Sequence, residues 1–175
     1  AWARVRAAPG AARGAPGAAG AGGAGMAQVF LYGTLRHAPL LERVLGGRPA
    51  AVRPARLGGH AVRAVADGAY PALVAETGAA AEGEVIALDD PASWERLCHY
   101  EAVFGYAPRP CTVETPEGTL AAQVFLLDAP PAPEGAWSLD AWAGAWAAQS
   151  LQAPAEALAP TARMAPVAPP PLPPD

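Results

Sequence analysis

The sequence contains no lysine, since all twelve of its cationic side chains are arginines. Chemistry that needs a lysine amine, such as Schiff-base formation or a phosphate-binding loop that ends in lysine, is therefore excluded. Cysteine is also scarce: Cys98 and Cys111 are too few for a disulfide framework or a four-cysteine metal site, and they fit a reducing cytoplasm. No run of about 18 strongly apolar residues occurs, so no membrane-spanning helix is expected.

Positive charge is not in excess, because the formal net charge is −4 and the sequence pI is about 5.3. The arginines are scattered without interleaved aromatic residues, which argues against binding to nucleic acid or to an anionic membrane. The three histidines, His37, His60 and His99, have no metal-ligand spacing with the acidic residues, so no metal site is predicted. We therefore expect a small-molecule ligand and predict no oligomeric state.

Two low-complexity ends frame the chain. Residues 1–25 consist almost wholly of Ala, Gly, Pro and Arg, and residues 151–175 are rich in Pro and Ala. Neither end has enough large apolar side chains to offset the entropy lost on ordering, so a disordered leader and a disordered tail are predicted. The leader is either sequence upstream of a natural start at Met26 or a transit peptide, and the tail is a linker or a ligand for a proline-recognising domain. One folded domain is expected over residues 26–150.

The middle of the chain mixes strand and helix patterns. Helices are expected over residues 39–45, from an Asp90 cap to about Tyr100, and after a Ser138 cap. Strands are expected over residues 28–32, 56–66 with a kink, 72–75, 84–88, 111–114 and 120–127, the last two flanking a hairpin turn. Because the strands do not alternate regularly with helices, an α+β fold or a closed barrel is favoured over a doubly wound sheet.

The second expected helix carries the most informative pattern. Trp94, Leu97, Cys98 and Glu101 occupy positions i, i+3, i+4 and i+7 and so share one stripe of the helix. A carboxylate in line with an apolar stripe, at the negative end of a helix, has a raised pKa and suits a general base. The alternative is that the helix ends at Tyr100 and Glu101 is solvated or paired with Arg109. Periodicity alone does not decide between them.

Four segments carry a family resemblance. They are VFLYGTLR, YPALV, GEVIAL and LCHYEAVFGYAPR, which begin at Val29, Tyr70, Gly83 and Leu97. Their order and spacing resemble the γ-glutamylcyclotransferase-like family, which includes the avirulence-induced-gene-like proteins. The resemblance covers residues 26–127, and it implies an α+β fold: a small barrel of mixed, largely antiparallel strands with flanking helices around one cavity.

The resemblance also implies site residues and a reaction. Glu101 would be the acid/base, Tyr70 would lie beside the cavity, and Tyr106 could place a hydroxyl in it. Arg109 could hold the substrate carboxylate or Glu101; for Tyr106 and Arg109, ordinary packing and surface roles are equally open. The loop that holds a γ-glutamyl substrate would consist of Tyr32, Gly33, Thr34 and Leu35. The implied reaction is cofactor-independent: the substrate amine attacks its own γ-carbonyl and releases 5-oxoproline and an amine.

Two other functions stay open at this level. The domain could be a non-catalytic or accessory module of the same fold, of the kind that can precede a Nudix-type hydrolase, although these residues contain no Nudix glutamate motif. It could also be an interaction barrel that presents Trp137, Trp142 and Trp146 to a partner. Ala102 stands where many relatives carry glycine, so the leaving amine is not predicted.

Overall fold

The computed structural model describes residues 27–65, 70–129 and 132–152. Its elements are β1 (Ala27–Leu31), the 3-10 helix η1 (Thr34–Arg36), α1 (Ala38–Leu45), β2 (Ala51–Val65), β3 (Pro71–Leu88), α2 (Pro91–Val103), β4 (Tyr106–Thr115), β5 (Gly118–Leu127), β6 (Pro133–Ala136) and α3 (Leu139–Leu151). Five strands close into a barrel in the order β3-β1-β5-β4-β2, with β2 pairing back to β3. The β1–β5 pairing is parallel and the other pairings are antiparallel. The predicted mixed barrel with flanking helices is confirmed.

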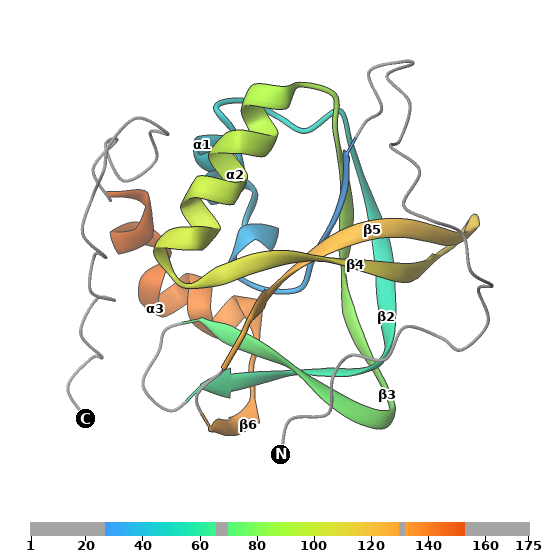
Figure 1. Cartoon of the computed structure of the whole chain (residues 1–175). Coiled ribbons are helices and arrows are strands. Elements are labelled where there is room, and N and C mark those ends of the chain that lie inside the picture. The colour runs from blue at the N-terminus through green and yellow to red at the C-terminus, as the bar shows by residue number, and fades with distance from the viewer. Residues whose placement is uncertain (1–26, 66–69, 130–131, 153–175) are drawn as a thin grey trace.

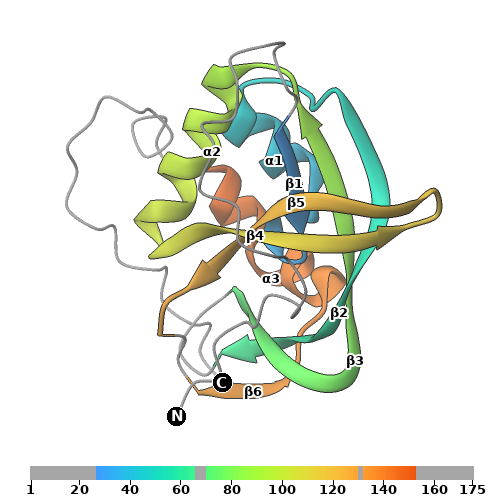
Figure 2. The ribbon, with the colours of Figure 1, turned by 45° about the vertical axis from the view of Figure 1, so that its right-hand side comes forward.

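The three α-helices lie on one side of the barrel, while the β4–β5 hairpin projects on the opposite side (Figure 1). The short strand β6 pairs with the end of β2 and leads into α3 (Figure 2). Buried side chains form one cluster where the helices meet the barrel wall and a second that includes Phe30, Leu73 and Val113. None of the helices in the described ranges is long and apolar enough to cross a membrane.

Strand β1 supplies both clusters. Val29 and Leu31 belong to the cluster under the helices, and Phe30, with Tyr32 just beyond the strand, belongs to the second cluster. Successive side chains of a strand point to opposite faces, so a strand covered on both faces is apolar throughout. At Gly83 of the neighbouring β3, an added Cβ would lie 2.3 Å from the Leu31 carbonyl oxygen. Glycine is therefore required where β3 passes β1.

Strands β2 and β3 form a long ribbon that bends strongly (Figure 1). The predicted kink in β2 is confirmed: the pairing register shifts between Gly58 and His60, and Gly59 has a φ of +73°. The prediction of two separate strands over residues 72–75 and 84–88 was wrong, because β3 runs without interruption from Pro71 to Leu88. Its central residues are mostly Ala, Gly and Glu, which have low strand propensity, but residues 80–83 pair with β2, and this pairing overrides local preference.

The three helices expected from the sequence are present. The N-caps at Asp90 and Ser138 are confirmed, since the Asp90 carboxylate accepts hydrogen bonds from the amides of Ala92 and Ser93, and the Ser138 hydroxyl accepts one from Ala141. The predicted leader, residues 1–25, lies outside the described part of the chain, as does the predicted tail beyond residue 152.

Candidate active site

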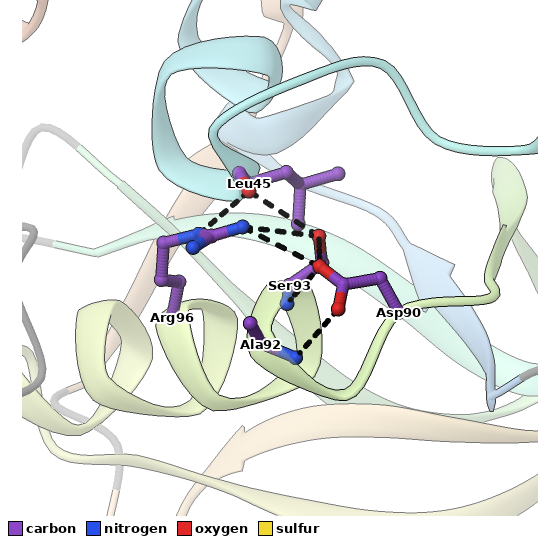
Figure 3. Close-up of polar contacts among 5 residues, drawn as sticks. All are labelled: Leu45, Asp90, Ala92, Ser93 and Arg96. Carbon is purple, nitrogen blue, oxygen red and sulfur yellow. Dashed lines mark hydrogen bonds and ion pairs between the residues drawn. The ribbon is translucent and has the colours of Figure 1, made fainter.

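Helix α2 positions Glu101 in its last turn. Asp90 Oδ1 accepts a hydrogen bond from the amide of Ala92 at 3.1 Å, and Oδ2 accepts one from the amide of Ser93 at 3.0 Å (Figure 3). These bonds satisfy amides that have no partner within the helix. Pro91, at the first helical position, has its φ already fixed near the helical value.

The start of α2 is also tied to the end of α1. The Ser93 hydroxyl and Arg96 Nε both donate to the carbonyl oxygen of Leu45, at 3.3 and 2.6 Å (Figure 3). Leu45 is the last residue of α1, and Gly46 ends that helix with a φ of +76°. The last carbonyls of a helix lack intrahelical partners. These bonds therefore join the two helix ends without replacing a hydrogen bond within either helix. They fix the orientation of α2 and therefore the place of Glu101.

The helix continues past Glu101 to Val103, so the alternative in which it ends at Tyr100 is wrong. Leu97 is fully buried in the cluster under the helices, and Trp94 and Cys98 pack against it. Glu101 is partly buried, and its carboxyl makes no hydrogen bond or ion pair with any residue in the described ranges. Burial raises the pKa of this carboxyl to about 8. Such a group exchanges protons near neutrality.

Three tyrosines experience the charge of this carboxyl. Burial raises the pKa of Tyr32, Tyr100 and Tyr106, and the negative charge of Glu101 raises each of them further. The three phenols therefore lie within electrostatic range of the carboxyl. The Tyr32 hydroxyl donates to the Phe125 carbonyl at 2.9 Å, and the Tyr106 hydroxyl donates to the Pro71 carbonyl at 2.8 Å. Each of these two phenols is therefore held in one orientation.

The predicted substrate loop follows β1 and enters η1. Its first backbone hydrogen bond runs from the amide of Arg36 to the carbonyl of Gly33 at 3.1 Å. The amides of Thr34 and Leu35 precede that bond and so have no partner within the turn. The Leu35 side chain is buried in the core, which leaves only its backbone for a ligand. A Cβ at Gly33 would lie 2.9 Å from Pro71 Cγ, so glycine lets the loop lie close against the start of β3.

The structure places Tyr70 with the site and Arg109 away from it. The ring of Tyr70 lies 6.1 Å from that of Tyr106 and 5.8 Å from that of Phe104, measured between centroids. Arg109 is exposed on β4, where its Nη2 lies 2.8 Å from Asp128 Oδ1. It forms no ion pair with Glu101. The structure thus brings together Glu101, Tyr32, Tyr70 and Tyr106. Gly33 is linked to this group because it lies against Pro71, whose carbonyl accepts the hydrogen bond from Tyr106.

A pocket of about 420 Å³ opens beside the loop. Tyr32 and Arg36 line it, together with residues of β2, of β3 and of the start of α3. Glu101 is not among the lining residues, and Tyr32 connects the pocket with the carboxyl. Sequence reasoning missed Arg36. The available signal was its place at the end of the YGTLR motif, one residue beyond the loop that the resemblance implied.

The sequence model of one protein family, described as gamma-glutamyl cyclotransferase, AIG2-like, matches residues 29–143. The chain belongs to this family. No functionally curated protein matches it at a significant level. Within the ranges that the structure describes, no group of three or more His, Cys, Asp or Glu side chains could hold a metal ion.

Solved structures agree with the AIG2-like family at the level of the fold. Two solution structures of Arabidopsis thaliana proteins both have a TM-score of 0.55, and their sequences are 19% and 20% identical to this chain. Each alignment covers 73% of this chain, and the alignments cover 87% and 78% of the two Arabidopsis proteins. A structure named gamma-glutamyl cyclotransferase has a TM-score of 0.51 and 16% identity, with 82% of this chain and 94% of that chain covered. Identities this low support a common fold and no more.

Proposed function

We propose that this member of the AIG2-like family is a γ-glutamyl cyclotransferase, with Glu101 as its general acid/base. The observation that carries the proposal is a partly buried carboxyl whose pKa is raised to about 8 and which no described residue pairs with. A carboxyl held without a partner is costly to stability, and this cost is typical of functional sites. The substrate is a γ-glutamyl compound, and the products are 5-oxoproline and an amine.

The backbone of the loop at Gly33 to Leu35 binds the α-carboxylate of the γ-glutamyl group, since amides without intrahelical partners favour an anion. Glu101 accepts a proton from the α-amine of the substrate. The freed nitrogen attacks the γ-carbonyl carbon and closes a five-membered ring. The bond from that carbon to the leaving nitrogen breaks, and Glu101 returns the proton to the leaving amine.

Both reacting groups belong to one molecule, so the enzyme has to hold one conformation and move one proton. Tyr32 and Tyr106 are positioning residues in this account, because their hydroxyls donate to the backbone carbonyls of Phe125 and Pro71. They form the walls that hold the substrate and the carboxyl. Arg109, paired with Asp128 at the surface, has no part in the proposed steps.

The proposal is tested with a panel of γ-glutamyl amino acids and γ-glutamylamines, each paired with its α-glutamyl isomer. A cyclotransferase releases equal amounts of 5-oxoproline and free amine from at least one γ-isomer. The α-isomers have no leaving group on the γ-carbonyl and should give none. A folded protein that leaves the whole panel intact would sink the proposal and favour the accessory-module hypothesis.

A further inference from the structure

The side chain of Arg36 is an unusual feature of the pocket. Arg36 is partly buried and lines the pocket together with Tyr32. Its Nε is buried and has no hydrogen-bond partner, and its guanidinium forms no ion pair with any acid in the described parts of the chain. Buried polar atoms are nearly always paired, and a buried N–H donor without a partner destabilises the fold. A ligand that supplies an anion would satisfy it.

The acids that also line the pocket do not neutralise Arg36. The Glu82 carboxylate pairs instead with Arg56, at 2.8 Å. Asp140 is exposed in the first turn of α3, where the positive end of the helix dipole offsets its charge. Arg36 therefore has no ion-pair partner among the acids that line the pocket, within the residues that the structure describes.

In the proposed function the leaving half of the substrate extends into this pocket, because Tyr32 of the loop lines it. The residues of the loop, which bind the γ-glutamyl half in the proposed function, are followed directly by Arg36. Tyr32 belongs both to the pocket and to the site around Glu101. Small apolar side chains, Ala61, Val62 and Ala80, line the strand side of the pocket and leave room for a substituent of modest size.

We infer that Arg36 binds a carboxylate on the leaving half of the substrate and so determines specificity. The inference rests on the proposed function. The guanidinium can donate two parallel N–H bonds to one carboxylate, which gives both strength and orientation. The enzyme then prefers γ-glutamyl amino acids, whose leaving half ends in a carboxylate, over γ-glutamylamines that lack one.

The test compares γ-glutamyl-alanine with γ-glutamyl-alaninamide, which differ only in the charge of that group. For the wild type, kcat/KM is expected to be at least about 10-fold higher for the carboxylate, as is typical of a charge-assisted pair. In Arg36→Gln this ratio should fall close to one. In Arg36→Lys, which keeps the positive charge but cannot donate two parallel N–H bonds, the ratio should be intermediate. Arg48→Gln, at an exposed arginine outside the pocket lining, should keep the wild-type ratio. A wild-type ratio near one, or a ratio that Arg36→Gln leaves unchanged, overturns the inference.

Calorimetric binding of the same two compounds separates this inference from the proposed function. If the wild type releases no 5-oxoproline from these two compounds or from any other γ-glutamyl compound of the panel, the proposed function fails. The wild type could still bind γ-glutamyl-alanine more tightly than γ-glutamyl-alaninamide. If this difference is lost in Arg36→Gln but retained in Arg48→Gln, it would still support Arg36 as the residue that binds the carboxylate. Equal binding of both compounds by the wild type would overturn it. Thermal unfolding of each variant shows that the comparison is made between folded proteins.

Discussion

The Tyr106 hydroxyl donates a 2.8 Å hydrogen bond to the carbonyl of Pro71, the residue whose ring lies against Gly33. Tyr106 begins β4, shortly after Glu101 in the chain, and its pKa is raised by burial and by the charge of Glu101. Pro71 begins β3 beside the loop. One buried hydrogen bond therefore links the start of β4, five residues after the proposed acid/base Glu101, to the start of β3 beside the proposed substrate loop.

Replacing this hydroxyl should weaken both the fold and the site. In Tyr106→Phe the Pro71 carbonyl loses its buried partner, so the free energy of unfolding should fall by about 1–2 kcal/mol. Urea denaturation measures this change. Tyr100→Phe is the matched control, because the Tyr100 hydroxyl makes no hydrogen bond within the described residues. Equal stabilities for the two variants would show that the Tyr106 bond contributes nothing.

The raised pKa of Glu101 predicts how stability depends on pH. Between the ordinary pKa of 4.5 and about 8, the folded protein binds this proton more tightly than the unfolded chain does. The free energy of unfolding therefore falls as pH rises through this window. Glu101→Gln removes the penalty, so its stability relative to wild type should increase across the window, by on the order of 2 kcal/mol because partial exposure reduces the full effect.

Denaturant unfolding at several pH values checks this prediction. Glu95→Gln, at an exposed glutamate of the same helix, serves as the control for loss of a carboxylate. A difference between Glu101→Gln and wild type that stays constant with pH would mean that Glu101 is not held in a desolvated site.

Two glycine substitutions test the packing in opposite directions. Gly83→Ala places a Cβ 2.3 Å from the Leu31 carbonyl and 2.6 Å from the Phe30 ring, so it should destabilise the protein by about 2 kcal/mol or more. Gly144→Ala, in α3, meets no atom within 4 Å and should stabilise the helix by about 0.5–1 kcal/mol. Thermal unfolding of both proteins gives the comparison, and equal shifts would contradict the close approach of β1 and β3.

Much of this fold could be predicted because its signals are local. The N-caps at Asp90 and Ser138, the apolar run of β1 and the turn between β4 and β5 depend on neighbouring residues. The continuity of β3 could not be predicted, since its central residues are held by pairing with β2. Strand β6, four exposed residues paired with β2, has no pattern of its own.

The site divides in the same way. Helical periodicity placed Glu101 on an apolar stripe, and the family motif identified the loop at Gly33. Neither could show that the carboxyl has no partner among the described residues, that Arg109 pairs with Asp128, or that Arg36 lines a pocket. The ion pair of Arg109 depends on the register of the β4–β5 hairpin, and the pocket depends on residues far apart in the chain that the fold brings together.

The most direct measurement is the rate of 5-oxoproline release from a γ-glutamyl amino acid by wild type, Glu101→Gln and Glu95→Gln, across a range of pH. The account predicts that the wild-type kcat/KM rises with pH to a plateau with a midpoint near 8, since the carboxylate form accepts the proton. Glu95→Gln should follow the same curve, and Glu101→Gln should lose at least about 100-fold in kcat while remaining folded. Wild-type turnover by Glu101→Gln would contradict the account.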